Sequence, residues 1–155
     1  MKKFYIITII FLSASLIFGQ DGNSKFSSSA NSQTKQMPSE LSAKIDGFFK
    51  TLITKKVDIA FLELVKGSAL EKKKDDITNL IQQTFKSFDI YGDLKKFEKI
   101  NHQFAGSSYL RVSYIASHST YPTRWVFTFY QSPDSGWGLT NIKFDDLTEN
   151  FFKED

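Results

Sequence analysis

Two histidines are the side chains of this sequence best suited to catalysis, because an imidazole exchanges protons near neutral pH. If strand side chains alternate, His102 is in phase with Ile100 and Phe104, and His118 is in phase with Tyr114. Both imidazoles could then point from a sheet into the protein interior. There His102 or His118 would act as a general base beside Tyr114, in a cofactor-independent lyase or isomerase.

A structural role for the same histidines is favoured. His118 is flanked by Ser117, Ser119 and Thr120, which are typical of a turn, and His102 could lie on an exposed edge strand. The sequence identifies no partner that would orient either imidazole, as a catalytic base requires. We therefore expect no catalytic residue and keep the enzyme as the alternative.

Metal and cofactor sites are not predicted. The chain has no cysteine, and the adjacent carboxylates of Asp145 and Asp146 would point to opposite faces of a strand. It contains no glycine-rich phosphate loop and no serine in a nucleophile-elbow pattern. We expect no metal and no cofactor.

A β-hairpin is predicted around the turn at residues 132–136. Residues 123–131 are rich in aromatic and β-branched types, and residues 137–146 alternate as a returning strand. The predicted register pairs Gln131 with Trp137, Phe129 with Leu139, Phe127 with Asn141, and Val126 with Ile142.

Both faces of this hairpin are expected to be apolar. One face carries Trp125, Phe127, Phe129, Trp137 and Leu139, and the other carries Val126, Tyr130, Ile142 and Phe144. A hairpin wetted on one side would show polar residues there, so we expect helices on one face and a strand layer or second subunit on the other. A ligand or partner could stack on the aromatic residues Trp125, Phe127, Phe129 and Trp137, although such residues more often belong to a core.

A structural ion pair is predicted between Arg124 and Asp146. The chain has only two arginines, Arg111 and Arg124, and a guanidinium pairs with a carboxylate in a fork geometry that lysine lacks. In the predicted register Arg124 lies opposite Phe144 and on the same face as Asp146. An ion pair at the open end of the hairpin is favoured over an anion-binding role.

The remaining sequence predicts an α+β domain. Apolar residues recur every three or four positions in three segments, 39–53, 58–67 and 68–91, as expected for amphipathic helices. Alternation then predicts strands at 94–104 and 109–117 before the hairpin. The domain is expected at residues 39–147, with a C-terminal tail at 148–155.

The N-terminus predicts export. Residues 1–19 have the layout of a signal peptide, and residues 20–38 form a serine-rich leader. Cleavage near Gly19 would remove two lysines from the 20 Lys and Arg residues, which would then nearly balance the 17 acidic residues. We therefore expect a periplasmic or secreted protein with no nucleic-acid partner and no membrane attachment after cleavage.

Three helices before a run of antiparallel strands resemble the nuclear transport factor 2-like superfamily over residues 39–147. The segments 66–70, 91–92, 121–127 and 137–146 are also similar to a family of uncharacterised exported bacterial proteins. The superfamily resemblance implies three N-terminal helices packed on a curved four-stranded antiparallel sheet, a cone with a pocket and an outer face that often forms a dimer. We therefore expect a non-catalytic domain that binds a small apolar ligand or an envelope protein, or forms a homodimer.

Overall fold

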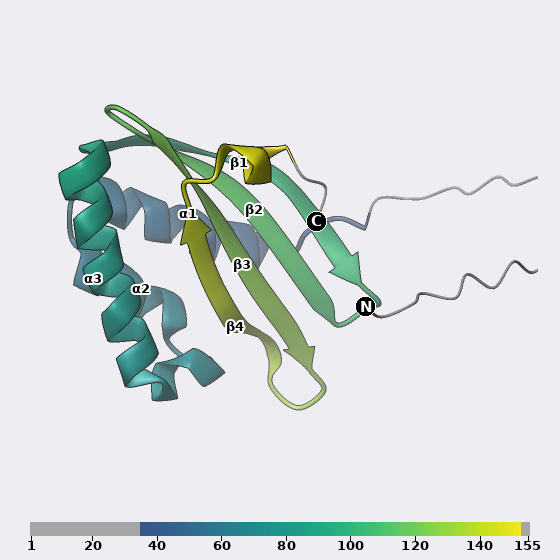
Figure 1. The fold of residues 1–155 in the computed structure, drawn as a ribbon. Helices are drawn as coiled ribbons and strands as arrows, with labels where there is room; N and C mark the ends of the chain where they lie inside the picture. Colours follow the sequence, from purple (N-terminus) through teal and green to yellow (C-terminus); the bar gives the residue numbers. More distant parts are fainter. Residues whose placement is uncertain (1–34, 153–155) are drawn as a thin grey trace, which may run out of the picture. The chain divides into compact units, whose positions relative to one another are not determined.

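The computed structural model describes residues 35–152 (Figure 1). The predicted signal peptide at 1–19 and the leader up to residue 34 lie outside the described residues. Within them the chain is α+β, with three α-helices before a four-stranded antiparallel sheet, as the sequence predicts. No helix formed by residues 35–152 is long and apolar enough to cross a membrane.

The helices follow the predicted apolar stripes. They are α1 (Ser39–Ile53), α2 (Val57–Val65) and α3 (Lys74–Tyr91), with a short 3₁₀ helix η1 (Ala69–Lys72) before α3. The third helix begins later than predicted because residues 67–71 form a tight turn. There the Ser68 hydroxyl donates to the Val65 carbonyl at 2.6 Å, and the Glu71 carboxylate accepts from the Gly67 amide at 2.8 Å.

The sheet is a simple meander. Its strands are β1 (Leu94–Ala105), β2 (Tyr109–His118), β3 (Pro122–Ser132) and β4 (Gly136–Asp145), in the order β1-β2-β3-β4. The helices pack on one face, which we call the inner face (Figure 1). A 3₁₀ turn, η2 (Thr148–Phe151), follows β4, and its Asn150 side chain donates to Asp145 at 3.2 Å.

An aromatic cluster fills the space between α1 and the inner face. The ring centroid of Phe48 lies 5.4 Å from that of Trp125, and the ring centroid of Phe49 lies 5.8 Å from that of Phe127. Both are edge-to-face ring pairs. Trp125, Phe127 and Phe129 are at most 1% exposed, and Trp137 is half-buried against them. Trp125, Phe127 and Phe129 therefore belong to the core of the described domain and are not accessible to a ligand or partner, whereas Trp137 packs against this core and stays partly exposed.

The hairpin register is predicted correctly only next to the turn. Gln131 pairs with Trp137 and Phe129 pairs with Leu139, as expected. A one-residue bulge at Thr140 then shifts β4, so that Phe127 pairs with Ile142 and Trp125 with Phe144. The predicted pairs Val126 with Ile142 and Phe127 with Asn141 are therefore wrong.

The bulge also removes the second apolar face of the hairpin. Past Thr140, Ile142 and Phe144 turn to the inner face, where the Phe144 ring stacks on Trp125 at 4.4 Å. The opposite, outer face receives Asn141 and Lys143 in their place. The expectation of two apolar faces is wrong, and the homodimer that it suggested stays a prediction.

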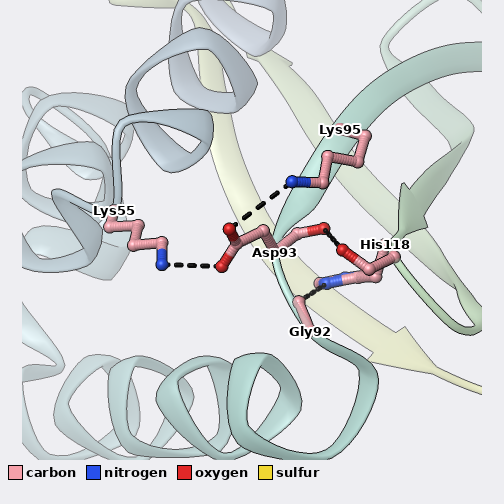
Figure 2. A network of polar contacts seen from close by, with 6 residues as sticks. Lys55, Gly92, Asp93, Lys95 and His118 are labelled. Carbon is pink, nitrogen blue, oxygen red and sulfur yellow. Dashed lines mark hydrogen bonds and ion pairs between the residues drawn. The ribbon is translucent and has the colours of Figure 1, made fainter.

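Gly92 joins α3 to β1 in a conformation that other residues rarely adopt. Its φ is +79°, and a Cβ placed on it would lie 2.9 Å from the Cβ of Ser119. The Ser119 hydroxyl donates to the Asp93 carbonyl at 3.3 Å, and the Asp93 carboxylate is bound by Lys55 at 2.6 Å and by Lys95 (Figure 2). The junction therefore needs both the positive φ and the missing side chain.

Replacing Phe127 with alanine should lower the free energy of unfolding by about 3–5 kcal/mol, because it opens a cavity in the aromatic cluster. The neighbouring Val126→Ala change, on the outer face, should cost about 1 kcal/mol or less. Urea denaturation of both variants measures the difference. Equal losses would show that the two faces of β3 are not buried differently.

Gly92→Ala should destabilise the domain more than Gly67→Ala, by about 1–3 kcal/mol. Both glycines have a positive φ, which costs alanine about 1–2 kcal/mol at either position. Only the methyl group at residue 92 meets another atom, because the space beside Gly67 is open. Thermal or urea unfolding compares the two, and a similar loss at both sites would rule out the close approach to Ser119.

Candidate functional site

A hollow of about 490 Å³ lies on the outer face of the sheet. Its walls come from β2, β3 and β4, and we call it the outer-face hollow. The side chains that line it are mostly polar: Tyr109, Arg111, Arg124, Val126, Thr128, Thr140, Asn141, Lys143 and Asp145.

Strand alternation places these residues on one face. In β2 and β3 the buried apolar residues face the helices, so Arg111 and its neighbour Thr128 point the other way. In β4 the bulge at Thr140 brings Lys143 and Asp145 to the same side. Two regular strands and one bulged strand therefore assemble the hollow.

The charges of the outer-face hollow are mainly positive. Arg111, Arg124 and Lys143 line it against one carboxylate, that of Asp145. Arg124 is only 5% exposed, whereas Arg111 and Lys143 are exposed. A guanidinium withdrawn from water interacts more strongly with an anion than one on an open surface. The arrangement is chemically suited to holding an anionic group.

The acidic end of β4 differs from the prediction. Arg124 lies opposite Asp145 and not opposite Phe144, because of the bulge. The Asp145 carboxylate also accepts from the Leu147 amide and the Asn150 side chain, both at 3.2 Å. Asp146 instead accepts a hydrogen bond from the Tyr91 hydroxyl, which raises the pKa of Tyr91. The pairing of Arg124 with Asp146 stays a prediction, and the register makes Asp145 the direct cross-strand neighbour.

His118 is held in a chain of hydrogen bonds at the end of β2. Its Nδ1 lies 2.9 Å from the Gly92 carbonyl (Figure 2), and its Nε2 lies 3.3 Å from the Thr123 hydroxyl. That hydroxyl accepts from the Trp125 indole at 3.0 Å, so its own hydrogen is available to Nε2. Nδ1 then carries the proton of a neutral ring, and burial lowers the pKa of His118. Both ring nitrogens are engaged in holding the fold.

The alternative catalytic set is not assembled. His118 lies opposite Leu94 at the start of β1, whereas His102 lies opposite Val112 towards its other end. Six residues of β2 separate these two levels, which is roughly 20 Å at about 3.3 Å per residue. His102 Nε2 lies 2.9 Å from the Lys35 carbonyl.

Tyr114 lies between the two histidines and is only 2% exposed. Burial is the main reason why the pKa of Tyr114 is raised, followed by the charge of Asp46. Within residues 35–152, no group of three or more His, Asp or Glu residues is placed to hold a metal ion.

Several residues of the outer-face hollow were not singled out from the sequence. Lys143 and Asn141 are missed because the predicted register places Ile142 on the outer face. A signal was present: Leu139 and Ile142 are both apolar and three positions apart, which an unbroken strand would send to opposite faces. Reading that spacing as a bulge would have placed Lys143 on the outer face.

Lowering the pH from about 7.5 to about 5.5 should destabilise the domain through His118. Below about pH 6.5, His118 binds a proton in the unfolded chain more readily than in the folded chain, where its ring is buried. The free energy of unfolding therefore falls. In His118→Gln this contribution should disappear. Urea unfolding at both pH values tests it, with His102→Gln as the control that keeps the pH dependence. A pH dependence unchanged in His118→Gln would show that another group causes it.

The chain has no match among protein-family models, curated proteins or solved structures. The likeness to the nuclear transport factor 2-like superfamily therefore stays a prediction. What is shown is the coarser architecture, three helices followed by a four-stranded antiparallel sheet. Any function has to be argued from the residues themselves.

Proposed function

We propose that this is an exported, non-catalytic binding domain whose ligand carries an anionic group held in the outer-face hollow. The observation that carries the proposal is the position of Arg124, which lines the hollow while only 5% exposed. Arg111 and Lys143 add two exposed cations to the same hollow. A carboxylate, phosphate or sulfate group is the chemistry that such a set recognises.

The size and lining of the hollow favour a small molecule. A volume of about 490 Å³ falls within the usual range of small-molecule sites. Arginine can bind the two oxygens of a planar or tetrahedral anion at once, whereas Lys143 supplies a point charge. Thr128, Thr140 and Asn141 can hydrogen-bond to other polar atoms of the ligand. Asp145 can accept from a ligand hydroxyl or amine.

Binding is favoured over catalysis because of the side chains that are present. None of the residues lining the outer-face hollow is a histidine or a cysteine, the usual proton carrier and nucleophile near neutral pH. The lyase or isomerase alternative depends on His102 and His118, which lie at opposite ends of the sheet. His118 is also occupied by Gly92 and Thr123.

An apolar ligand inside the domain has less support than an anion outside it. The Phe48 ring contacts Phe61 at 5.1 Å and Trp125 at 5.4 Å, so aromatic side chains occupy the space that such a ligand would need. The ligand is therefore proposed to meet the outer face of the sheet. An acidic segment of an envelope protein would satisfy the same chemistry as a small anion.

Inorganic phosphate is a simple probe of this proposal. Titrating it into the full chain should shift the amide NMR signals of β2, β3 and β4 around the outer-face hollow. Arg111→Gln should weaken binding at least about tenfold, the effect of losing one charge-assisted hydrogen bond of about 1.5 kcal/mol. Arg111 is preferred to Arg124 because its exposed side chain can be replaced without opening the fold.

The matched control is Lys96→Gln, which removes one positive charge from an exposed position on β1 outside the hollow. Its phosphate affinity should stay within about twofold of the parent chain, since exposed charges at a distance are screened. Equal losses in the two variants would reduce the effect to general attraction between charges. If phosphate moves the amide signals of Arg111→Gln as much as those of the parent chain, the site is rejected.

A further inference from the structure

The outer edge of β4 is open along its second half. Among the described strands β4 pairs with β3 alone. Two hollows adjoin it, one of about 290 Å³ lined by residues 140–143 and one of about 240 Å³ lined by residues 144–146. Successive side chains of a strand point to opposite faces, so a hollow on one face touches alternate residues. Contact with every residue from 140 to 146 means that the hollows lie against the backbone edge itself.

The opposite wall of both hollows is mainly one face of α3, which is joined at the first hollow by Leu70 of η1 and by Lys73. Residues 76, 77, 79, 80 and 83 line the first hollow, and residues 83, 86, 87, 90 and 91 line the second. This spacing follows the helical repeat, and Gln83 belongs to both hollows. Together they form one channel between the helix and the strand edge, which we call the α3–β4 groove. In Figure 1, α3 stands on the side of the sheet where β4 forms the edge.

We infer that the α3–β4 groove binds an extended peptide segment of a partner protein, which adds to β4 as a fifth strand. An exposed strand edge offers a row of backbone donors and acceptors to such a segment. Residues 140–145 would pair with about six peptide residues, or roughly 20 Å of strand at about 3.3 Å per residue. The hydrogen bond from the Tyr91 hydroxyl to Asp146 closes the groove beyond them. This peptide site does not require the anion proposed for the outer-face hollow, although Thr140, Asn141, Lys143 and Asp145 line both places.

The groove also has an apolar anchor point and two charged ends. Ile90 is 64% exposed and lines the second hollow, as does Phe144. The second hollow is lined by two carboxylates, Asp145 and Asp146, and one cation, Lys86. The first is lined by two cations, Lys73 and Lys143, and one carboxylate, Asp76. A complementary peptide therefore carries a basic residue and an apolar residue at the Asp146 end and an acidic residue at the other.

A single extended segment fits better than a second copy of the chain or its own leader. α3 runs along the far wall of the groove, so the edge strand of another folded domain would meet the helix before pairing along residues 140–145. The described chain begins at Lys35, which contacts His102 on β1 at the other edge of the sheet. Antiparallel pairing is the more stable arrangement, so the basic end of the peptide is its N-terminal end.

Two capped, fluorescently labelled peptides with the same composition test this, KIVTVTE and its charge-swapped control EIVTVTK. Fluorescence anisotropy with the full chain should show tighter binding of KIVTVTE. Ile90→Glu should weaken that binding at least about tenfold, because it places a charge at the apolar anchor. The matched control is Leu62→Glu, since Leu62 is 62% exposed on α2 and lines neither hollow.

Amide NMR shifts complete the test. Binding of KIVTVTE should move the signals of consecutive residues from 140 to 145, as pairing along an edge requires. Failure of the peptide to bind, shifts confined to another surface, or equal weakening by Leu62→Glu would overturn the inference. Protection of the β4 amides in the free chain would also overturn it. Sedimentation would give the mass of two copies if a second chain covers the edge, and of one copy if the leader covers it.

Discussion

The single extra residue in β4 at Thr140 is the constraint on which both faces of the sheet depend. Before it, Leu139 pairs with Phe129 on the inner face, and after it Ile142 pairs with Phe127 on that same face. Without the bulge, the apolar residues of one half of β4 would face water, because a shift of one residue moves every side chain to the other face. The bulge keeps the apolar side chains together.

What the bulge brings inward determines what remains outside. Phe144 stacks on Trp125, which joins the end of β4 to the ring cluster that Phe48 and Phe49 of α1 make with β3. Lys143 and Asp145 are then left on the outer face, beside the arginines of β2 and β3. The dry inner face and the charged outer face are thus two results of one local irregularity, and the outer-face hollow needs the bulge as much as the core does.

The sequence predicts the elements of this fold better than their register. The stripe of α1 and the alternation of β2 and β3 are strong repeating patterns, since a few kcal/mol of burial enforces each of them. A bulge carries no such pattern: Thr140 differs from its neighbours only in interrupting the spacing between Leu139 and Ile142. Histidines attract attention by their chemistry, yet His118 works here as a neutral link between Gly92 and Thr123.

The two edges of the sheet differ in how well they resist strand addition. β1 carries Lys95, Lys96 and Lys99 and has two register shifts, both of which hinder pairing with a further strand. β4 has its one shift at Thr140 and runs in regular register from residue 141 to 145 with a single lysine. If avoiding aggregation were the only constraint, we would expect lysines and register shifts on both edges. The regular edge is instead the one beside α3, where a helix restricts access to a single extended segment.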